Sequence, residues 1–189
     1  MPPITLSLKN NYDQLLNAKL SLSDRKMYKN DSMFSYHNVL CEHDDKTGQL
    51  QIVCSNLKLP IGYAGNGAIL VKLRGSDNPL LKVLRGIERQ IMASAPSGMV
   101  VKPLVKEPDQ DSWCPSIKLK TDKCGIHKDS NGTLQQGCVL ERCLITVSRL
   151  NHYQGSYYGA CYLKSAQIGS QEDDDEFDEE NLDLLNMDE

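Results

Sequence analysis

The chain has 189 residues and a mass of 21.1 kDa, which is the size of one domain with appendages and argues against a two-domain enzyme. Its formal charge is −4, but the acidic and basic residues are unevenly distributed along the chain. Residues 171–189 hold 11 of the 25 acidic residues and no Lys or Arg, so residues 1–170 carry 21 basic and 14 acidic residues, a net charge of +7. No run approaches the roughly 18 apolar residues of a membrane span, and no secretory leader is evident, so we expect a soluble, intracellular protein with no membrane partner.

Short runs of alternating or β-branched apolar residues recur along the chain and predict a β-rich body. Turn signals rich in Gly, Asn and Ser separate several of them, as at 45–48 and 154–156, and such short connections favour antiparallel hairpins. In chain order, the expected strands are Ile4 to Lys9, Met33 to Leu40, Gln49 to Cys54, Ala68 to Arg74, Met99 to Val105, Ser116 to Thr121, Cys138 to Leu150 and Tyr157 to Ile168.

One segment has the pattern of a helix. Asp77 or Asn78 can cap it, Pro79 suits its first position, and apolar residues recur every three to four residues, which predicts a helix over about 79–93. Residues 11–20 are equally compatible with a second helix and with irregular structure. Two helices are too few for a parallel sheet of about eight strands, so the pattern favours a mainly β, antiparallel fold.

Residues 171–189 form an acidic tail that cannot bury enough apolar surface to offset the entropy of ordering it. We therefore expect two parts, a β-rich domain over 1–170 and a disordered tail over 171–189. Apolar residues interspersed among the acids are typical of interaction segments. The predicted partner-binding residues are Phe177, Leu182, Leu184, Leu185 and Met187.

No motif predicts catalysis or a cofactor. The chain lacks a phosphate-binding loop, a zinc-protease helix, a nucleophile elbow and a dinucleotide fingerprint, and the Gly-rich run 62–67 is best explained as a turn. A cysteine nucleophile with a histidine base, or a carboxylate site for Mg²⁺ from Asp44, Asp45 and residues 109–111, is an alternative without supporting spacing. We therefore expect that the protein is not an enzyme.

The seven cysteines are odd in number and widely spaced, which favours free thiols in a reducing compartment. Cys124 and His127 could supply two ligands to a tetrahedral zinc site, completed by Cys138 or Cys143, with Cys114 as a further candidate. The spacings are irregular, and Cys138 and Cys143 would point to opposite faces of one strand. Buried thiols that act as small apolar side chains are therefore the preferred interpretation, and we expect no bound metal.

Basic and aromatic residues share the predicted strands. On the run 117–120, the two-residue period sends both lysines to one face and the apolar pair to the other. A protein that binds single-stranded nucleic acid needs cations that contact the phosphates and, beside them, aromatic rings that stack on the unpaired bases. The alternative is the ordinary solvated face of an antiparallel sheet. The candidate binding residues are Trp113, Lys118, Lys120, Arg142, Arg149, Tyr153, Tyr157, Tyr158, Lys72, Arg74, Tyr63, Tyr36 and Tyr28.

The opposite charges of body and tail favour the binding interpretation. A disordered polyanion tethered to a basic groove can occupy that groove as a mimic of nucleic acid, at an effective concentration that reaches about millimolar for short flexible tethers. An acidic end that merely aids solubility would not require a basic body.

The layout resembles single-stranded DNA-binding proteins with an OB-fold, of the kind found in large DNA viruses and phages. The resemblance rests on the run Trp113-Cys-Pro-Ser-Ile-Lys-Leu-Lys120, the hairpin from Arg142 to Lys164, and an acidic tail that contains an aromatic residue, Phe177. It implies an OB-like barrel with extra strands, coating of single strands during replication or recombination, and a location in host cytoplasm or nucleus.

We therefore expect sequence-independent binding of single-stranded DNA, with RNA as the alternative strand. The tail is expected to compete for the groove and to recruit replication or recombination proteins, and a homo-oligomer is compatible with this function. The alternative is a non-enzymatic interaction or assembly module whose acidic tail binds basic proteins.

Overall fold

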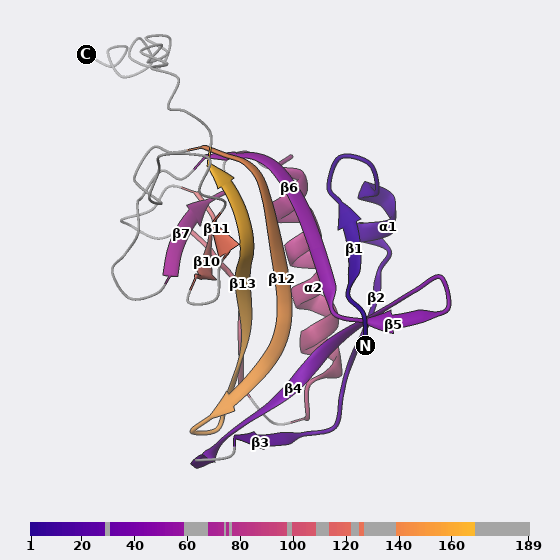
Figure 1. The fold of residues 1–189 in the computed structure, drawn as a ribbon. Helices are drawn as coiled ribbons and strands as arrows, with labels where there is room; N and C mark the ends of the chain where they lie inside the picture. Colours follow the sequence, from indigo (N-terminus) through magenta and orange to yellow (C-terminus); the bar gives the residue numbers. More distant parts are fainter. Residues whose placement is uncertain are drawn as a thin grey trace, which may run out of the picture.

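The fold is described from a computed structural model of the chain (Figure 1). It covers residues 1–28, 31–58, 68–73, 75, 77–97, 100–108, 114–121, 125–126 and 139–168, with the backbone alone for 31, 32, 58, 125 and 126. The elements are β1 (Ile4–Ser7), α1 (Tyr12–Leu16), β2 (Lys19–Leu22), β3 (Lys26–Tyr28), β4 (Asp31–His43), β5 (Lys46–Gly48), β6 (Leu50–Lys58), β7 (Ala68–Lys72), α2 (Pro79–Ser94), β8 (Val100–Lys102), β9 (Val105–Lys106), β10 (Ser116–Lys120), β11 (Gly125–Ile126), β12 (Val139–Tyr153) and β13 (Ser156–Ile168).

The prediction of a mainly β fold is confirmed. All eight expected runs contain a strand, and the expected turn at Gln154 and Gly155 joins β12 to β13. Gln154 and Gly155 both have positive φ, at 47° and 75°, and the glycine adopts this conformation without strain. The expected run 99–105 is divided, because Pro103 cannot donate a ladder hydrogen bond, and β8 and β9 lie on either side of it.

The main sheet has the order β1-β6-β12-β13-β10-β7. The long strands β12 and β13 form its centre and bend around α2 (Figure 1). One half of β12 pairs with β6, from Val139 to Thr146, and the other half pairs with β4, from Arg149 to His152. Strand β4 continues into a second ladder with β2 and β5. Among the described strands β1 and β7 do not pair, so the described path is open.

The pairing is mixed rather than purely antiparallel. The β12–β13 hairpin, the pairs of β12 with β4 and β6, and the β10–β7 pair are antiparallel, as expected. In contrast, β1–β6, β10–β13, β8–β13 and β11–β13 are parallel. Parallel pairs need long connections, and each of these pairs is joined through other elements of the fold. The sequence pattern shows where the strands lie but does not show which distant strands become neighbours.

Helix α2 covers one face of the sheet and matches the predicted helix almost to the residue. The Asn78 side chain accepts a hydrogen bond from Leu81 N at 3.1 Å, and Pro79 occupies the first turn. The apolar stripe of the helix is buried in the core together with residues from β1, β6, β7, β10, β12 and β13. The buried helix residues are Leu80, Leu81, Val83, Leu84, Ile87 and Ile91.

Two polar side chains attach α2 to neighbouring backbone. Gln90 donates to Ala18 O at 2.8 Å and accepts from Leu20 N at 2.9 Å, which fixes the start of β2. Glu88 Oε2 accepts from Leu104 N and Val105 N and so holds the segment before β9. Because these backbone groups are partly buried, the side chains satisfy donors and acceptors that water does not reach freely.

The expected second helix is shorter than the range 11–20. Helix α1 ends at Leu16, where the Asn17 side chain and backbone N–H both donate to Asp13 O. The next residues, Lys19–Leu22, form β2 against β4. Within the described residues, no helix is both long and apolar enough to cross a membrane.

Candidate nucleic-acid interface

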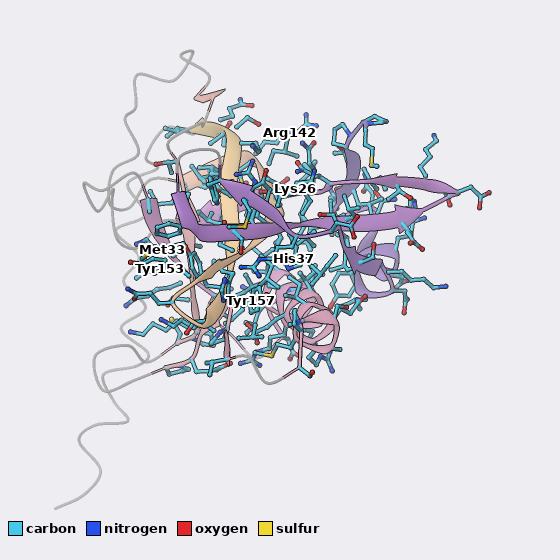
Figure 2. All side chains as sticks on the ribbon, turned by 90° about the horizontal axis from the view of Figure 1, so that it is seen from below. Lys26, Met33, His37, Arg142, Tyr153 and Tyr157 are labelled. Atoms are coloured by element: carbon cyan, nitrogen blue, oxygen red, sulfur yellow. The ribbon has the colours of Figure 1, made fainter. Side chains whose placement is uncertain are left out.

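We call the side of the sheet opposite α2 the outer face. Across β4, β12 and β13, Tyr36 pairs with Asn151, and Asn151 pairs with Tyr158, so these three residues lie side by side on one face. Tyr162 lies four residues beyond Tyr158 on the same side of β13. In Figure 2, Lys26 and Arg142 lie on this outer side of the sheet.

Four rings gather at the end of the outer face, beside the turn between β12 and β13. Tyr28 from β3 lies 4.9 Å from Tyr36 and 6.4 Å, edge to face, from Phe34, measured between ring centroids. Phe34 stacks on Tyr153 of β12 at 4.1 Å with an interplanar angle of 4°. We call these residues, Tyr28, Phe34, Tyr36 and Tyr153, the aromatic cluster. Tyr28 is 36% exposed, so one ring of the cluster is open to a stacking ligand.

Arg149 lies against this cluster. Its guanidinium carbon is 4.4 Å from the centroid of Tyr36 and 5.9 Å from that of Tyr28, which is cation–π geometry. Arg149 Nη1 also donates to the Tyr28 hydroxyl at 3.3 Å, and that hydroxyl donates to Asn151 Oδ1 at 3.1 Å. Since a guanidinium has five N–H donors, this arrangement orients the charge and leaves donors for a phosphate.

The neighbouring tyrosines of β13 have opposite environments. Tyr158 is half-buried on the outer face, where burial, and then the nearby Tyr28 and Tyr153, raise the pKa of its phenol. Tyr157 is 2% exposed and belongs to the core, with its ring 4.7 Å from His152 and 5.9 Å from His37. Figure 2 shows His37 and Tyr157 on the side of α2. We therefore leave Tyr157 out of the interface, because adjacent strand residues point to opposite faces.

A second group of cations lies farther along the outer face. Lys120 and Tyr162 are register partners of β10 and β13, and Lys120 Nζ lies 5.7 Å from the Tyr162 centroid. Lys164 Nζ approaches the same ring to 5.4 Å, and Lys118 is exposed two residues before Lys120. We call Lys118, Lys120 and Lys164 the lysine cluster. Lys72 of β7 is half-buried and pairs with Ser116, which places it on the same face.

Arg142 lies beside an open groove of about 320 Å³ on the same face. The charged residue among those that line the groove is Arg142, and the polar groups are hydroxyls and amides. Thr5 Oγ1 donates to Gln51 Oε1 at 3.1 Å, and Gln167 Nε2 donates to Glu141 Oε2 at 3.2 Å. The lining residues are Thr5, Gln51, Val53, Arg142, Cys143, Leu144, Ser165, Ala166 and Gln167.

The charges of the outer face are poorly neutralised by the described acids. The ion pairs Lys82–Asp77 and Arg85–Glu107 involve the helix, and His43 contacts Asp44 at the turn before β5. By contrast, no described carboxylate pairs with any of five outer-face cations, and Glu141 is bonded to Gln167. Unpaired cations on one face attract phosphate groups. The five cations are Lys118, Lys120, Arg142, Arg149 and Lys164.

Several predicted residues lie outside the described part of the chain. They are Trp113, Arg74 and Tyr63 of the candidate interface, the tail residues Phe177, Leu182, Leu184, Leu185 and Met187, and the zinc candidates Cys124, His127 and Cys138. Of the other zinc candidates, Cys143 pairs with Cys54 across β12 and β6, and Cys114 is buried. No group of three metal-ligating side chains occurs among the residues that the structure describes.

The structure adds three residues that sequence reasoning did not select. Phe34 lies two residues before Tyr36, and Lys164 lies two residues after Tyr162, so a strict two-residue count along each strand could have found them. Asn151 has no such signal, because its role depends on the hydroxyl of Tyr28 from a distant strand.

Comparison with known proteins does not assign the chain to a family. No protein-family model matches it, and no curated protein is significantly similar to it. A functional conclusion must therefore rest on the residues of the outer face.

Proposed function

We propose that the chain binds single-stranded DNA, independently of sequence, across the outer face of the sheet. The observation that carries this proposal is that the aromatic cluster and five cations without a described acidic partner share one face. Stacking on exposed rings is tolerant of sequence, because every base has a π-face, and cations along the same face can follow the phosphates. In this proposal the protein coats strands during replication or recombination and catalyses no reaction.

The residues divide into two roles. Tyr28, with its neighbours in the aromatic cluster, stacks on bases, and Arg149 contacts the adjacent phosphate. The lysine cluster and Arg142 contact phosphates farther along the strand. The OB-like barrel remains part of the proposal, supported by the strong bend of β12 and β13 and by the edge strands β1 and β7, whose closure would complete a barrel.

The acidic tail is proposed as a regulator. Its 11 acids can occupy the cations of the outer face, and its apolar residues can bind replication or recombination proteins once DNA displaces it. Competition of this kind lowers the apparent affinity for DNA by the fraction of time that the face is occupied.

A titration of a fluorescently labelled oligo-dT, followed by anisotropy at two salt concentrations, tests the proposal. We expect tight binding at low salt, with a log-log salt slope of about −0.7 for each phosphate contacted, and weaker binding of a duplex of the same length. The absence of binding at low salt would exclude the proposal. The double variant K118E/K120E should bind more weakly, whereas reversal of Arg89 on α2 should have little effect.

A second candidate is a protein-interaction or assembly module. It is favoured by large apolar side chains that are exposed at the same end of the molecule as the aromatic cluster. Met27 is 49% exposed, Met33 is 58% exposed and Val100 on β8 is 65% exposed. Salt separates the two candidates, because an apolar contact with a protein weakens much less than a phosphate contact as ionic strength rises.

A further inference from the structure

The groove beside Arg142 has a largely apolar floor and a polar wall. The floor is a row that crosses three strands, because Val53, Leu144 and Ser165 are register partners on β6, β12 and β13. All three side chains are half-buried, so they offer a surface on which a planar ring can lie. The wall is the next row along the strands, in which Arg142 and Gln167 are partners. Register partners project from the same face, so floor and wall both belong to the outer face.

The amide of Gln167 is held in one orientation. Gln167 Nε2 donates to Glu141 Oε2 at 3.2 Å. An ionised carboxylate only accepts hydrogen bonds, so the amide nitrogen must face Glu141 and the amide oxygen must face away from it. Within the described residues no donor reaches Gln167 Oε1. The wall therefore presents an acceptor, Gln167 Oε1, beside the donors of the Arg142 guanidinium.

The charge of the groove suits a neutral ring better than a run of phosphates. Arg142 is the cation among the lining residues, and Glu141 places a negative charge beside Gln167 at the rim. The lysine cluster lies next to the groove, because Lys164 precedes Ser165 of the floor. Phosphates can therefore follow the lysines while a base enters the groove. Its volume of about 320 Å³ is at the lower end of the range for small-molecule sites, about 300–1,000 Å³.

We propose that the groove holds one unpaired base of the bound strand, and that Gln167 Oε1 accepts a hydrogen bond from an N–H group on the Watson–Crick edge of that base. The ring lies on Val53 and Leu144, and Arg142 has donors for a base carbonyl and for the adjacent phosphate. This inference rests on the proposed binding of single-stranded DNA and adds to it a site that distinguishes single strands from duplex.

The chemistry of the bases explains this selectivity. Every DNA base carries an N–H donor on its Watson–Crick edge, so one acceptor in the groove can recognise an unpaired base of any sequence. In a duplex the same N–H group is already bonded to the complementary base and cannot reach Gln167. The groove therefore selects single strands without selecting a sequence, whereas contacts to phosphates alone do not distinguish the two forms in this way.

The test compares two oligonucleotides that differ at this N–H group alone. One is labelled oligo-dT, and the other has N3-methylthymidine at every position, which keeps the phosphates and the rings but removes the donor. In anisotropy titrations at low salt, the native chain should bind the methylated strand about 2-fold to 10-fold more weakly, which is the effect of one hydrogen bond. Since the charges are equal, the salt slopes of the two strands should be the same.

The variant Gln167→Met removes the acceptor without changing the charge or much of the length of the side chain. It should bind oligo-dT about as weakly as the native chain binds the methylated strand, and it should no longer distinguish the two strands. The matched control is Gln14→Met, because Gln14 is an exposed glutamine of α1 that does not line the groove. This control should distinguish the two strands as the native chain does.

Failure of this inference and failure of the proposed function give different results. If the native chain does not bind oligo-dT at low salt, both are wrong. If the native chain binds the two strands with equal affinity, or if Gln167→Met still distinguishes them, Gln167 does not contact the base edge, although binding of single-stranded DNA stands. The comparison of two strands on the native chain does not depend on the folding of any variant.

Discussion

Substitutions of Tyr28 and Arg149 should affect DNA binding in different ways, the first through affinity and the second through the salt dependence. Replacement of Tyr28 by Leu removes the ring that is most open to a base, together with the hydroxyl that bonds Arg149 and Asn151. The loss of one stacked base costs about 1–3 kcal/mol, or about 5-fold to 150-fold in the dissociation constant. Since no charge is removed, the salt slope should not change. Tyr28→Phe keeps the ring and should retain most of the affinity.

Arg149→Met, in contrast to Tyr28→Leu, should change the salt dependence of binding. It preserves the length and apolar stem of the side chain but removes one cation, so the magnitude of the salt slope should fall by about 0.7. The ratio of native to variant affinity should therefore be about fivefold larger at about 0.1 M salt than at about 1 M salt. The matched control is Arg89→Met, because Arg89 is exposed on α2 and, within the described part of the chain, donates to the Arg85 carbonyl of its own helix.

Anisotropy titrations of the four variants over a range of salt concentrations measure both quantities. Each variant is first compared with the native protein by thermal unfolding, so that affinities are measured on folded protein. Tyr28→Leu with native affinity, or Arg149→Met with a native salt slope, would refute the division into stacking and phosphate roles. An equal effect of Arg89→Met would show that only the net charge matters.

Three further outcomes are expected. Deletion of residues 171–189 should tighten binding of oligo-dT, most strongly at low salt where attraction between tail and body is least screened; unchanged affinity at low salt would leave the tail a role in partner binding alone. Gln90→Met should destabilise the fold by about 2 kcal/mol in urea unfolding, because two partly buried backbone groups lose their hydrogen-bond partner, whereas Arg89→Met should change stability by less than about 0.5 kcal/mol. Gly48→Ala would place a Cβ against the backbone carbonyl oxygen of Pro2, so it should cost about 1–3 kcal/mol of folding stability. Removal of residues 1–3 from the same variant should recover much of that loss.

Local patterns were sufficient to predict most of the elements. The apolar spacing of α2 and its capping residues define the helix, and the alternation of Lys118 and Lys120 with Ile117 and Leu119 places both lysines on the outer face. These features depend on neighbours within a few residues. The parallel pairs and the neighbours of β12 depend on residues that are distant in sequence, and a single sequence carries no direct record of them.

The positions of Arg142 and Arg149 show where counting along a strand fails. They are seven residues apart, so strict alternation would place them on opposite faces of β12. A register shift between Val147 and Arg149 inserts one extra residue, and both arginines therefore reach the outer face. The same reasoning applies to the aromatic cluster, whose members come from three strands. Composition indicated that tyrosines matter, but only the pairing of β4 with β12 brings Tyr36 to Arg149.

The pairing of β12 with β6 along one half and with β4 along the other also determines when the chain can fold. Its partners on these strands precede it by about 80 to 117 residues, and its other neighbour, β13, follows it directly. During synthesis, β4 and β6 therefore emerge long before the strand that covers their edges. Folding should be slow, because the entropy cost of closing such long loops comes before the contacts that offset it. In the meantime, open strand edges can pair with other chains. Fragments that end before residue 139 should consequently expose unpaired edges, and the full chain should be most sensitive to aggregation while it is being made.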